Sequence, residues 1–451
     1  MKTCAPGPLK SAAGLLLVSL LLLSACRSFA PEVLPDLKRY PQKASRYVDP
    51  AGPPSDPPGP AQPLPRKEDF LRNYFLPWHV QSPIFSKDDL FWPLDPEWEQ
   101  RLYGENTRPR SETWLASLKA SARPELFPLL DARGITLTNT NLRAMPTQKP
   151  AFHDFSEPGE GYPFDYFQNS ALWANTPVHI VHASRDKQWL LVEAGWIFGW
   201  VQARDIGLVD SQFVAAFEQN EMAAFIKDRV PVIDAGGIFR FSGRIGGLLP
   251  VIDRQNDTAL VLIAAADDKQ RAVVRQARLA PGDWARFPLA LTKGNLARLA
   301  DVFLGQDYGW GGLYANRDCS ALLRDLFTPF AIWLPRNSAQ QAEQGRVISL
   351  EGLSPGAKKR LILEKGVPFL TLIRKPGHIM LYIGSSQERP LVMHSMWGLK
   401  TRDFFQGEER YVVGRTVITS LTPEQGLPFF MRPQSTLLKQ VQSMNILIDP
   451  S

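Results

Sequence analysis

The sequence predicts an α+β fold: a C-terminal domain that packs a helix on an antiparallel sheet, preceded by two small β-barrels and a short helical region. Three observations predict it. Apolar residues follow Cys319 at helical spacing, β-rich runs bounded by turn residues follow residue 370, and two earlier stretches consist of short strands between Gly, Pro, Asn and Asp turns. A chain of 451 residues is long enough for two to four domains.

The N-terminus predicts export and lipid attachment. Lys2 and Lys10 precede an apolar run over residues 14–23, and Leu-Ser-Ala-Cys follows at residues 23–26. This order is typical of a lipoprotein signal peptide, so we expect residues 1–26 to be the signal, with lipidation at Cys26. The protein would then be held on a membrane of the cell envelope. A plain signal peptide or a short membrane helix are the alternatives, although the apolar run is shorter than the roughly 20 residues of a membrane span.

The chain between the signal and the C-terminal domain divides by composition. Proline is frequent up to residue 65, which predicts an extended linker, and an aromatic-rich stretch broken by proline follows it. Two β-rich stretches come next, and Gly-Trp-Val at residues 199–201 in the first resembles a late strand of bacterial SH3-type domains. The expected segments are a linker over 27–65, a mostly helical region over 66–130, an SH3-like barrel over 131–210, a helix around 212–227 and a second SH3-like barrel over 228–291.

Cys319 is the candidate nucleophile. Asp318 stands where a helix cap is expected, and Leu322, Leu323 and Leu326 form one apolar face after it. A thiol on the first turn of a helix meets the positive end of the helix dipole, so we expect a lowered thiol pKa. If Cys4 leaves with the signal and Cys26 is lipidated, Cys319 has no partner for an internal disulfide. The alternative is a buried structural cysteine.

Two histidines are candidates for the base that a thiol nucleophile requires. An apolar run begins directly after His378 and stops at Gly384, and a second run ends at His394. In a β-hairpin the start of the first strand and the end of the second lie at the same end, so His378 and His394 are expected to be neighbours. Cys, His and His at the ends of these elements predict a nucleophile, a general base and a residue that orients the base.

These motifs resemble the NlpC-type cell-wall cysteine peptidases, a bacterial branch of the papain-like fold. The run Tyr-Gly-Trp-Gly-Gly at residues 308–312, Asp-Cys-Ser at 318–320, Pro-Arg-Asn-Ser at 335–338 and Gly-His-Ile at 377–379 carry the resemblance, which covers about residues 295–420. Ala321 departs from the usual glycine, and Asn337 from the common aspartate. The resemblance implies a catalytic domain over 292–435 with a tail over 436–451. It implies substrate-binding roles for Tyr308, Asp318, Ser320, Asn337 and Ser338, and catalytic roles for Cys319, His378 and His394.

The resemblance also implies an activity. It is hydrolysis of peptidoglycan stem peptides between D-γ-glutamate and the following diamino acid, meso-diaminopimelate above all, in cell-wall turnover or recycling. Short connections between the barrels and the catalytic domain favour muropeptides with a free N-terminal L-alanine as substrates. Two alternatives remain open: an amidase or acyltransferase of the same fold, and a lipid-tethered wall-binding protein with an inert thiol.

Composition excludes several other classes. The formal net charge of +6 comes without any long Lys/Arg-rich run, so we expect no nucleic-acid partner. The sequence has no P-loop, dinucleotide fingerprint, H-E-x-x-H or G-x-S-x-G string. His179 and His182 point to opposite faces of an extended strand, so we expect no metal site there. We also expect no cofactor and a monomer.

Overall fold

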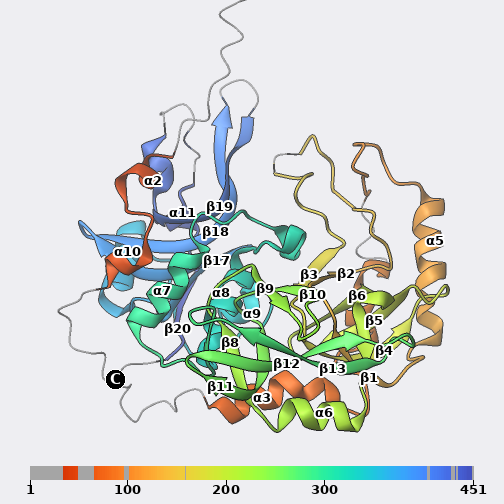
Figure 1. The fold of residues 1–451 in the computed structure, drawn as a ribbon. Helices are drawn as coiled ribbons and strands as arrows, with labels where there is room; N and C mark the ends of the chain where they lie inside the picture. Colours follow the sequence, from red (N-terminus) through yellow and green to blue (C-terminus); the bar gives the residue numbers. More distant parts are fainter. Residues whose placement is uncertain are drawn as a thin grey trace, which may run out of the picture.

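The structure is a computed structural model that describes residues 34–48, 66–95, 101–157, 159–403, 407–427, 432 and 435–448. The predicted signal peptide, with Cys26, lies outside these residues. Figure 1 shows the C-terminal domain, in cyan and blue, beside the β-rich part, in yellow and green. Within the described residues, no helix is long and apolar enough to cross a bilayer.

The C-terminal domain is built on one antiparallel sheet with the strand order β15-β20-β16-β17-β18-β19. Its helices are α7 (Lys293–Phe303), α8 (Cys319–Phe327), α9 (Ser338–Gln341) and α10 (Pro355–Lys365). The strands are β15 (Arg346–Ser349), β16 (Thr371–Lys375), β17 (His378–Ser386), β18 (Arg389–Asp403), β19 (Gly407–Ser420) and β20 (Ser443–Ile446). The expected α+β arrangement is therefore present.

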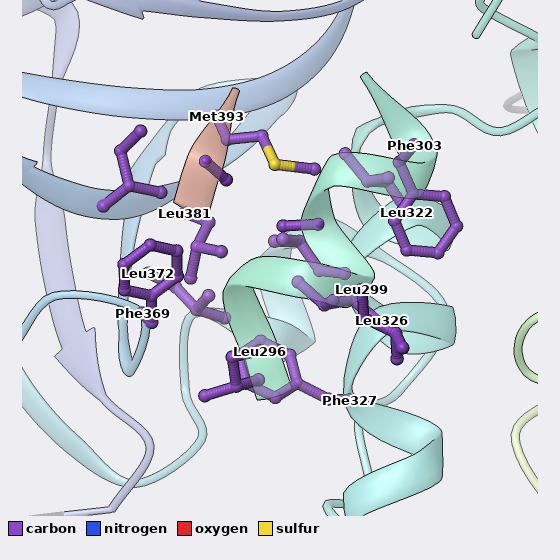
Figure 2. Packing of buried hydrophobic residues seen from close by; sticks show 14 of the residues in the cluster. Leu296, Leu299, Phe303, Leu322, Leu326, Phe327, Phe369, Leu372, Leu381 and Met393 are labelled. Carbon is purple, nitrogen blue, oxygen red and sulfur yellow. The ribbon is translucent and has the colours of Figure 1, made fainter. Parts of the chain in front are cut away.

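The core of this domain fixes the position of α8. Figure 2 shows apolar side chains of α7 and α8 packed against the sheet, and the cluster is fully or almost fully buried. The labelled residues are Leu296, Leu299, Phe303, Leu322, Leu326, Phe327, Phe369, Leu372, Leu381 and Met393. Each fully buried Leu or Phe side chain contributes roughly 1.5–3 kcal/mol, so this contact holds the start of α8 against the sheet.

The C-terminal segment is part of the sheet, which corrects the prediction of a separate tail over 436–451. After a short helix, α11 (Leu437–Gln440), strand β20 inserts between β15 and β16. Its four residues read Ser-Met-Asn-Ile, and Met444 and Ile446 are fully buried. So short a run carries little periodicity, and the pairing depends on partners that are more than 60 residues away in the chain.

The first barrel is a seven-stranded sheet with the order β3-β2-β6-β5-β4-β1-β7. Its strands are β1 (Ala132–Thr136), β2 (Thr140–Arg143), β3 (Gln168–Leu172), β4 (Pro177–Ala183), β5 (Trp189–Ala194), β6 (Ile197–Gln202) and β7 (Ile206–Leu208). Trp200, from the Gly-Trp-Val motif, is fully buried in a cluster that the barrel shares with the helices before it. The long connection between β2 and β3 rises on the same side of the molecule as the β18–β19 hairpin (Figure 1).

The second barrel begins earlier than the sequence predicts. Helix α6 (Ser211–Glu218) is shorter than the expected helix around 212–227, because Glu221–Phe225 forms β8 between β11 and β14. A five-stranded sheet has the order β13-β12-β11-β8-β14, and β9 pairs with β10. The other strands are β9 (Val230–Ile233), β10 (Phe239–Gly243), β11 (Leu248–Gln255), β12 (Thr258–Ala266), β13 (Ala272–Leu279) and β14 (Trp284–Arg286).

The region before the barrels consists of short helices that pack on the rest of the chain. These are α3 (Lys67–Phe75), η2 (Leu76–Trp78), α4 (Lys87–Leu90), η3 (Trp92–Leu94), α5 (Glu112–Ala122) and η5 (Pro124–Leu126). Ser111 caps α5 as expected, since its side chain accepts a hydrogen bond from the N–H of Trp114. Trp78 is buried, and its indole N–H donates to the carbonyl of Gly134 at 2.7 Å, which attaches this region to the first barrel.

Residues 34–48 correct the prediction of an extended linker. They form α2 (Pro35–Arg39) and η1 (Ala44–Tyr47), which pack on the C-terminal domain. The buried carboxylate of Asp36 accepts hydrogen bonds from the N–H and hydroxyl of Ser420 at 2.8 and 2.7 Å, and Gln42 bonds both backbone groups of Ile418. Proline content predicts an extended chain, but Asp36 and Gln42 form hydrogen bonds with β19 that the local sequence pattern does not predict.

Candidate active site

Cys319 stands at the first position of α8, as the sequence predicts. Asp318 is the N-cap, and its Oδ1 accepts a hydrogen bond from the N–H of Ala321 at 2.9 Å. The sulfur lies close to β17, since the backbone N–H of Ile379 hydrogen-bonds to it. Cys319 is 9% exposed and lines a cavity at the surface of the C-terminal domain. Cys319 is thus buried without being sealed from ligands.

The two histidines are neighbours, also as predicted. His378 starts β17 and His394 lies on β18, and the atoms Nε2 of His378 and Nδ1 of His394 are 2.8 Å apart. The polar turn between the strands places Ser386 opposite Arg389, which sets this register. A third residue extends the chain of contacts, because Nε2 of His394 is 3.1 Å from Oγ1 of Thr419 on β19.

This chain of hydrogen bonds determines the tautomer of both rings. The Thr419 hydroxyl donates its proton to the carbonyl of Ser420 at 2.8 Å, so it accepts from His394 Nε2–H. A neutral His394 then has its lone pair on Nδ1, which accepts from His378 Nε2–H. The remaining nitrogen of His378, Nδ1, therefore carries a lone pair. That is the state in which His378 can take a proton from a thiol.

The electrostatics of the thiol correct one expectation. Burial and the neighbouring Asp318 carboxylate raise the pKa of Cys319 from 9.0 to about 11, although the N–H of Ile379 and the charge of Arg336 act in the opposite direction. The helix start alone predicts a lowered pKa. The cap of this helix is an anion, however, and it offsets the helix dipole at the sulfur. The resting nucleophile is the neutral thiol.

Both histidines are also neutral at rest. Burial, followed by the neighbouring His394 and Lys375, lowers the pKa of His378 well below 6.5. Burial and Lys375 lower the pKa of His394 to about 3. Because the thiol and the imidazole are both neutral, the thiol must transfer its proton as the sulfur attacks a substrate. In the hydrogen-bonded tautomer, Nδ1 of His378 is the acceptor of this proton.

Asp318 and Ser320 are tied to a residue that the sequence analysis did not single out. Arg336 donates to Oδ2 of Asp318 at 2.6 Å and to the Ser320 hydroxyl at 2.9 Å. All three side chains are buried, and burial of a charge without a partner is costly, so the ion pair holds both residues in place. The side chain of Arg336 also donates to the hydroxyl of Ser170 in the first barrel at 2.7 Å.

The Tyr-Gly-Trp-Gly-Gly loop joins the site to the first barrel. Gly311 and Gly312 have φ of +55° and +81°, and a Cβ on Gly311 would lie 2.1 Å from the carbonyl oxygen of Gln168 on β3. Glycine is therefore required where the loop meets β3. Gln168 donates to the carbonyl of Gly311 at 2.9 Å, and Trp310 donates to the carbonyl of Asp165 at 3.0 Å.

The cavity has a volume of about 640 Å³ and is lined by residues of the C-terminal domain, of the first barrel and of the helical region before it. All eight residues predicted for the site line it, namely Tyr308, Asp318, Cys319, Ser320, Asn337, Ser338, His378 and His394. Asn337 also caps α9, since its Oδ1 accepts from the N–H of Gln340 at 2.8 Å. From the first barrel, Phe164, Tyr166 and Gln168 are among the lining residues. The site is therefore a cleft between the C-terminal domain and the parts of the chain that precede it.

The sequence did not lead us to include Arg336 and Thr419 in the site, for two different reasons. Arg336 lies in the quoted Pro-Arg-Asn-Ser string, and a charged residue inside a motif is a signal that could have found it. Thr419 lies in a β-rich run, where threonine is ordinary, so only the pairing of β18 with β19 identifies it. No group of three His, Cys, Asp or Glu side chains suited to a metal ion occurs in the described part of the chain.

Comparison with known proteins agrees with this geometry. Residues 305–405 match the NlpC/P60 family, residues 15–127 the N-terminal NLPC_P60 stabilising domain, residues 150–202 an SH3 domain of SH3b1 type and residues 210–255 an SH3 domain of SH3b2 type. The stabilising-domain match includes residues 34–48, in keeping with their packing on β19. The SH3b2 match begins before β8, in keeping with the earlier start of the second barrel.

Individual relatives give the same picture. A probable endopeptidase NlpC homolog from Haemophilus influenzae is 32% identical over 105 residues, which are 23% of this chain and 49% of the relative. The chain thus spans about half the length of that curated relative. The structure of an NlpC/P60 endopeptidase from Photobacterium damselae subsp. piscicida is 25% identical and superposes with a TM-score of 0.78 over 91% of this chain and 98% of that one.

An NlpC/P60 family protein from Bacillus cereus is 14% identical, with a TM-score of 0.45 over 70% of this chain and all of the other (100%). The resemblance predicted from the Cys319 and His378 motifs is confirmed. The chain is a multidomain protein with an NlpC/P60 domain of papain-like fold, the N-terminal stabilising domain that accompanies it, and two SH3 domains.

Proposed function

We propose that this protein is a cysteine endopeptidase that hydrolyses peptidoglycan stem peptides at the bond between D-γ-glutamate and the following diamino acid. The observation that carries the proposal is the hydrogen-bonded series from Thr419 through His394 to His378, with Cys319 beside it in one cleft. The name of the Haemophilus relative, probable endopeptidase, supports the same class of reaction.

The first half of the reaction is formation of a thioester. Nδ1 of His378 takes the thiol proton while Sγ of Cys319 attacks the γ-carbonyl carbon of D-glutamate. The backbone N–H of Cys319, at the free start of α8, donates to the oxyanion that forms. His394 Nδ1 accepts from Nε2–H of the new imidazolium and so keeps the ring in place. His378 then gives its proton to the leaving amine, and the C–N bond breaks.

The second half releases the acid. A water molecule enters the place of the amine. His378 takes a proton from this water while the water oxygen attacks the thioester carbonyl. The C–S bond breaks, the thiolate of Cys319 recovers the proton from His378, and the D-glutamyl carboxylic acid leaves. This route consumes one water molecule for each peptide bond and needs no cofactor.

The walls of the cleft support a preference for small substrates. Phe164 of the first barrel meets Trp310 with ring centroids 5.1 Å apart, and Trp397 lies 6.0 Å from Tyr308. These rings narrow the cleft beside the nucleophile. We therefore expect released muropeptides with a free N-terminal L-alanine to enter, and stems attached to the glycan to be excluded.

A membrane location belongs to the same proposal. The lipoprotein signal ending at Cys26 would place the enzyme on the envelope membrane, near released muropeptides. Metabolic labelling with an alkyne fatty acid tests this point. Wild-type protein should take up the label and a Cys26→Ala variant should not, and labelling of the variant would refute the lipid attachment.

The activity itself is tested with two substrates. The full chain in detergent, beside its Cys319→Ala variant, is incubated with L-Ala-γ-D-Glu-meso-diaminopimelate and with the same stem attached to muramic acid, and products are identified by mass spectrometry. Cleavage of the free peptide alone, lost in the variant, supports the proposal. Cleavage of both would mean an open cleft and a wall hydrolase. Cleavage of neither would favour an acyltransferase or a wall-binding protein.

A further inference from the structure

The first described segment of the chain presents a positively charged face to solvent. We refer to this segment, residues 34–48, as the strap. Its anchoring side chains are buried on the C-terminal domain, and they are Leu34, Asp36, Tyr40 and Ala44. The cations that alternate with them are all exposed. We call these cations the basic face of the strap, and they are Lys38, Arg39, Lys43 and Arg46.

The charges of the basic face are not balanced within the described part of the chain. None of its four cations forms an ion pair or a side-chain hydrogen bond with another described residue. Asp36, the one acidic residue of the strap, is buried and accepts from Ser420. Asp301 of α7 meets the strap at its backbone, where Oδ1 accepts from the N–H of Ser45 at 3.3 Å. Of the strap's own charged side chains, only the cations are therefore exposed.

The strap holds the basic face in a fixed position. α2 packs on β19, and η1 packs on α7 and β17. Leu34 and Ala44 have no exposed surface, and Gln42 bonds both backbone groups of Ile418. Figure 1 shows α2 on the side of the C-terminal domain away from the β-rich part. The cations are thus preorganised on an outer surface of the C-terminal domain, and none of them lines the catalytic cleft.

The length of chain before the strap indicates what the basic face meets. Leu34 is eight positions after Cys26, the residue proposed above to carry the lipid. Eight residues span at most about 29 Å when fully extended. The linker that the sequence predicts over 27–65 would allow a much longer reach, but the chain is already fixed to the C-terminal domain from Leu34 onward. A lipid anchor at Cys26 would therefore keep the basic face close to the headgroups of the bilayer.

We propose that the basic face of the strap binds the surface of a bilayer that contains anionic phospholipids. The inference rests on the lipid attachment proposed at Cys26, and it is independent of the reaction at Cys319. An anionic bilayer attracts lysine and arginine over about one Debye length, roughly 8 Å at physiological ionic strength, and each such contact strengthens binding about 5-fold. The anchor raises the local concentration of headgroups, so contacts that are too weak to recruit a free protein can hold a tethered one.

Binding of the strap to the bilayer would determine where the enzyme works. The C-terminal domain would lie against the bilayer, with the β-rich part on its far side (Figure 1). The cleft would then stay near the membrane, whereas a free tether would let it move through the space beyond. This position favours small muropeptides that diffuse to the bilayer over stems that are fixed in a distant wall, in agreement with the proposed substrate.

Acetylation of lysines on anchored protein tests the proposal. A Cys319→Ala chain that begins at Cys26, and so retains every described residue, is coupled through the Cys26 thiol to a maleimide lipid. The vesicles are phosphatidylcholine alone or equal parts of phosphatidylcholine and phosphatidylglycerol. Acetylation of Lys38 and Lys43 by acetic anhydride is measured by mass spectrometry, relative to the exposed Lys119 of α5. We expect both to react at least about 5-fold more slowly in the anionic vesicles, and about 1 M salt to remove the difference.

Two double variants keep both reporter lysines. Arg39→Gln with Arg46→Gln removes half of the basic face and should lower the ratio of bound to free strap by about 25-fold, so acetylation should recover. Arg275→Gln with Arg278→Gln removes two exposed cations of β13 in the second barrel and should change nothing.

The outcomes separate this inference from the proposed function. The chemical anchor makes the result independent of whether cells attach a lipid, so failure of fatty-acid labelling and failure of strap binding are distinct results. Equal acetylation in the two kinds of vesicle, or no recovery in the strap variant, would overturn the inference. Protection by soluble polyglutamate added to neutral vesicles would also overturn it, because the basic face would then bind an anionic polymer and not specifically a bilayer.

Discussion

The two barrels belong to the same class of domain but contact the catalytic domain in different ways. The first barrel supplies Phe164, Tyr166 and Gln168 to the cleft. The second barrel, over its described residues, supplies no side chain to the cleft wall. It is linked to the C-terminal domain by a buried ion pair in which Arg317 donates to both oxygens of Asp228 at 2.6 and 2.9 Å. We infer that the first barrel forms part of the site and the second supports the fold.

Breaking the link to the second barrel should have the largest effect, and on stability. Arg317→Met leaves Asp228 buried without its cation and removes one of the two arginines that pair with Asp325, and loss of one partner from a buried pair costs about 3–5 kcal/mol. Denaturant unfolding followed by tryptophan fluorescence measures the change. Arg254→Met, which breaks an exposed pair with Glu221, should cost less than about 1 kcal/mol. A similar loss in the two variants would contradict the structural role.

Removing the Thr419 hydroxyl should affect catalysis without involving either barrel. Thr419→Val keeps the shape but leaves the buried Nε2–H of His394 without its acceptor, a loss of about 1–3 kcal/mol. We expect kcat to fall by roughly 10- to 100-fold with KM nearly unchanged, and the free energy of unfolding to fall by no more than the same 1–3 kcal/mol. Thr419→Ser keeps the hydroxyl and should retain most of the activity. Full activity in Thr419→Val would show that His394 needs no such partner.

Shortening a first-barrel side chain in the cleft should have a smaller effect, and only on kcat/KM. Phe164→Ala removes the ring that meets Trp310, and we expect about a 10-fold loss in kcat/KM, since aromatic contacts contribute about 0.5–1.5 kcal/mol beyond their burial. The matched control is Phe239→Ala in the second barrel, where the ring is 59% exposed and lies outside the cleft. If the two variants lose activity equally, the comparison between the barrels fails.

The smallest expected effect is that of pH on kcat/KM near neutral pH. Since the pKa of His378 lies well below 6.5 and that of Cys319 is raised to about 11, the neutral pair persists between these values. His378 loses its function as base only when pH falls through its lowered pKa. kcat/KM should therefore stay level from about pH 6 to pH 9. A decline that begins above pH 6.5 on the acid side would contradict this assignment.

The parts of the molecule that the sequence predicted correctly depend on local pattern. The helix after Cys319, the strands after His378 and before His394, and the polar turn between them each follow from spacing within about ten residues. The fold class followed from these elements, and the comparisons confirm it. The residue roles stay predictions, although the structure brings all eight predicted site residues to one cleft.

The parts that escaped prediction depend on distant partners. Strand β20 and residues 34–48 are held by pairs far away in the chain, such as Asp36 with Ser420. The raised thiol pKa results from burial and from the charge of Asp318, whereas the helix start alone predicts the opposite direction. Such effects arise in the folded protein and leave no periodic pattern in the sequence.

The most direct test of the account is to trap the acyl-enzyme. The full chain in detergent is mixed with L-Ala-γ-D-Glu-meso-diaminopimelate, quenched in acid within one turnover, and mapped by mass spectrometry. The account predicts an L-Ala-γ-D-Glu group joined as a thioester to Cys319, and none in the Cys319→Ala variant. Attachment to another residue, or product release by the variant at the wild-type rate, would contradict it.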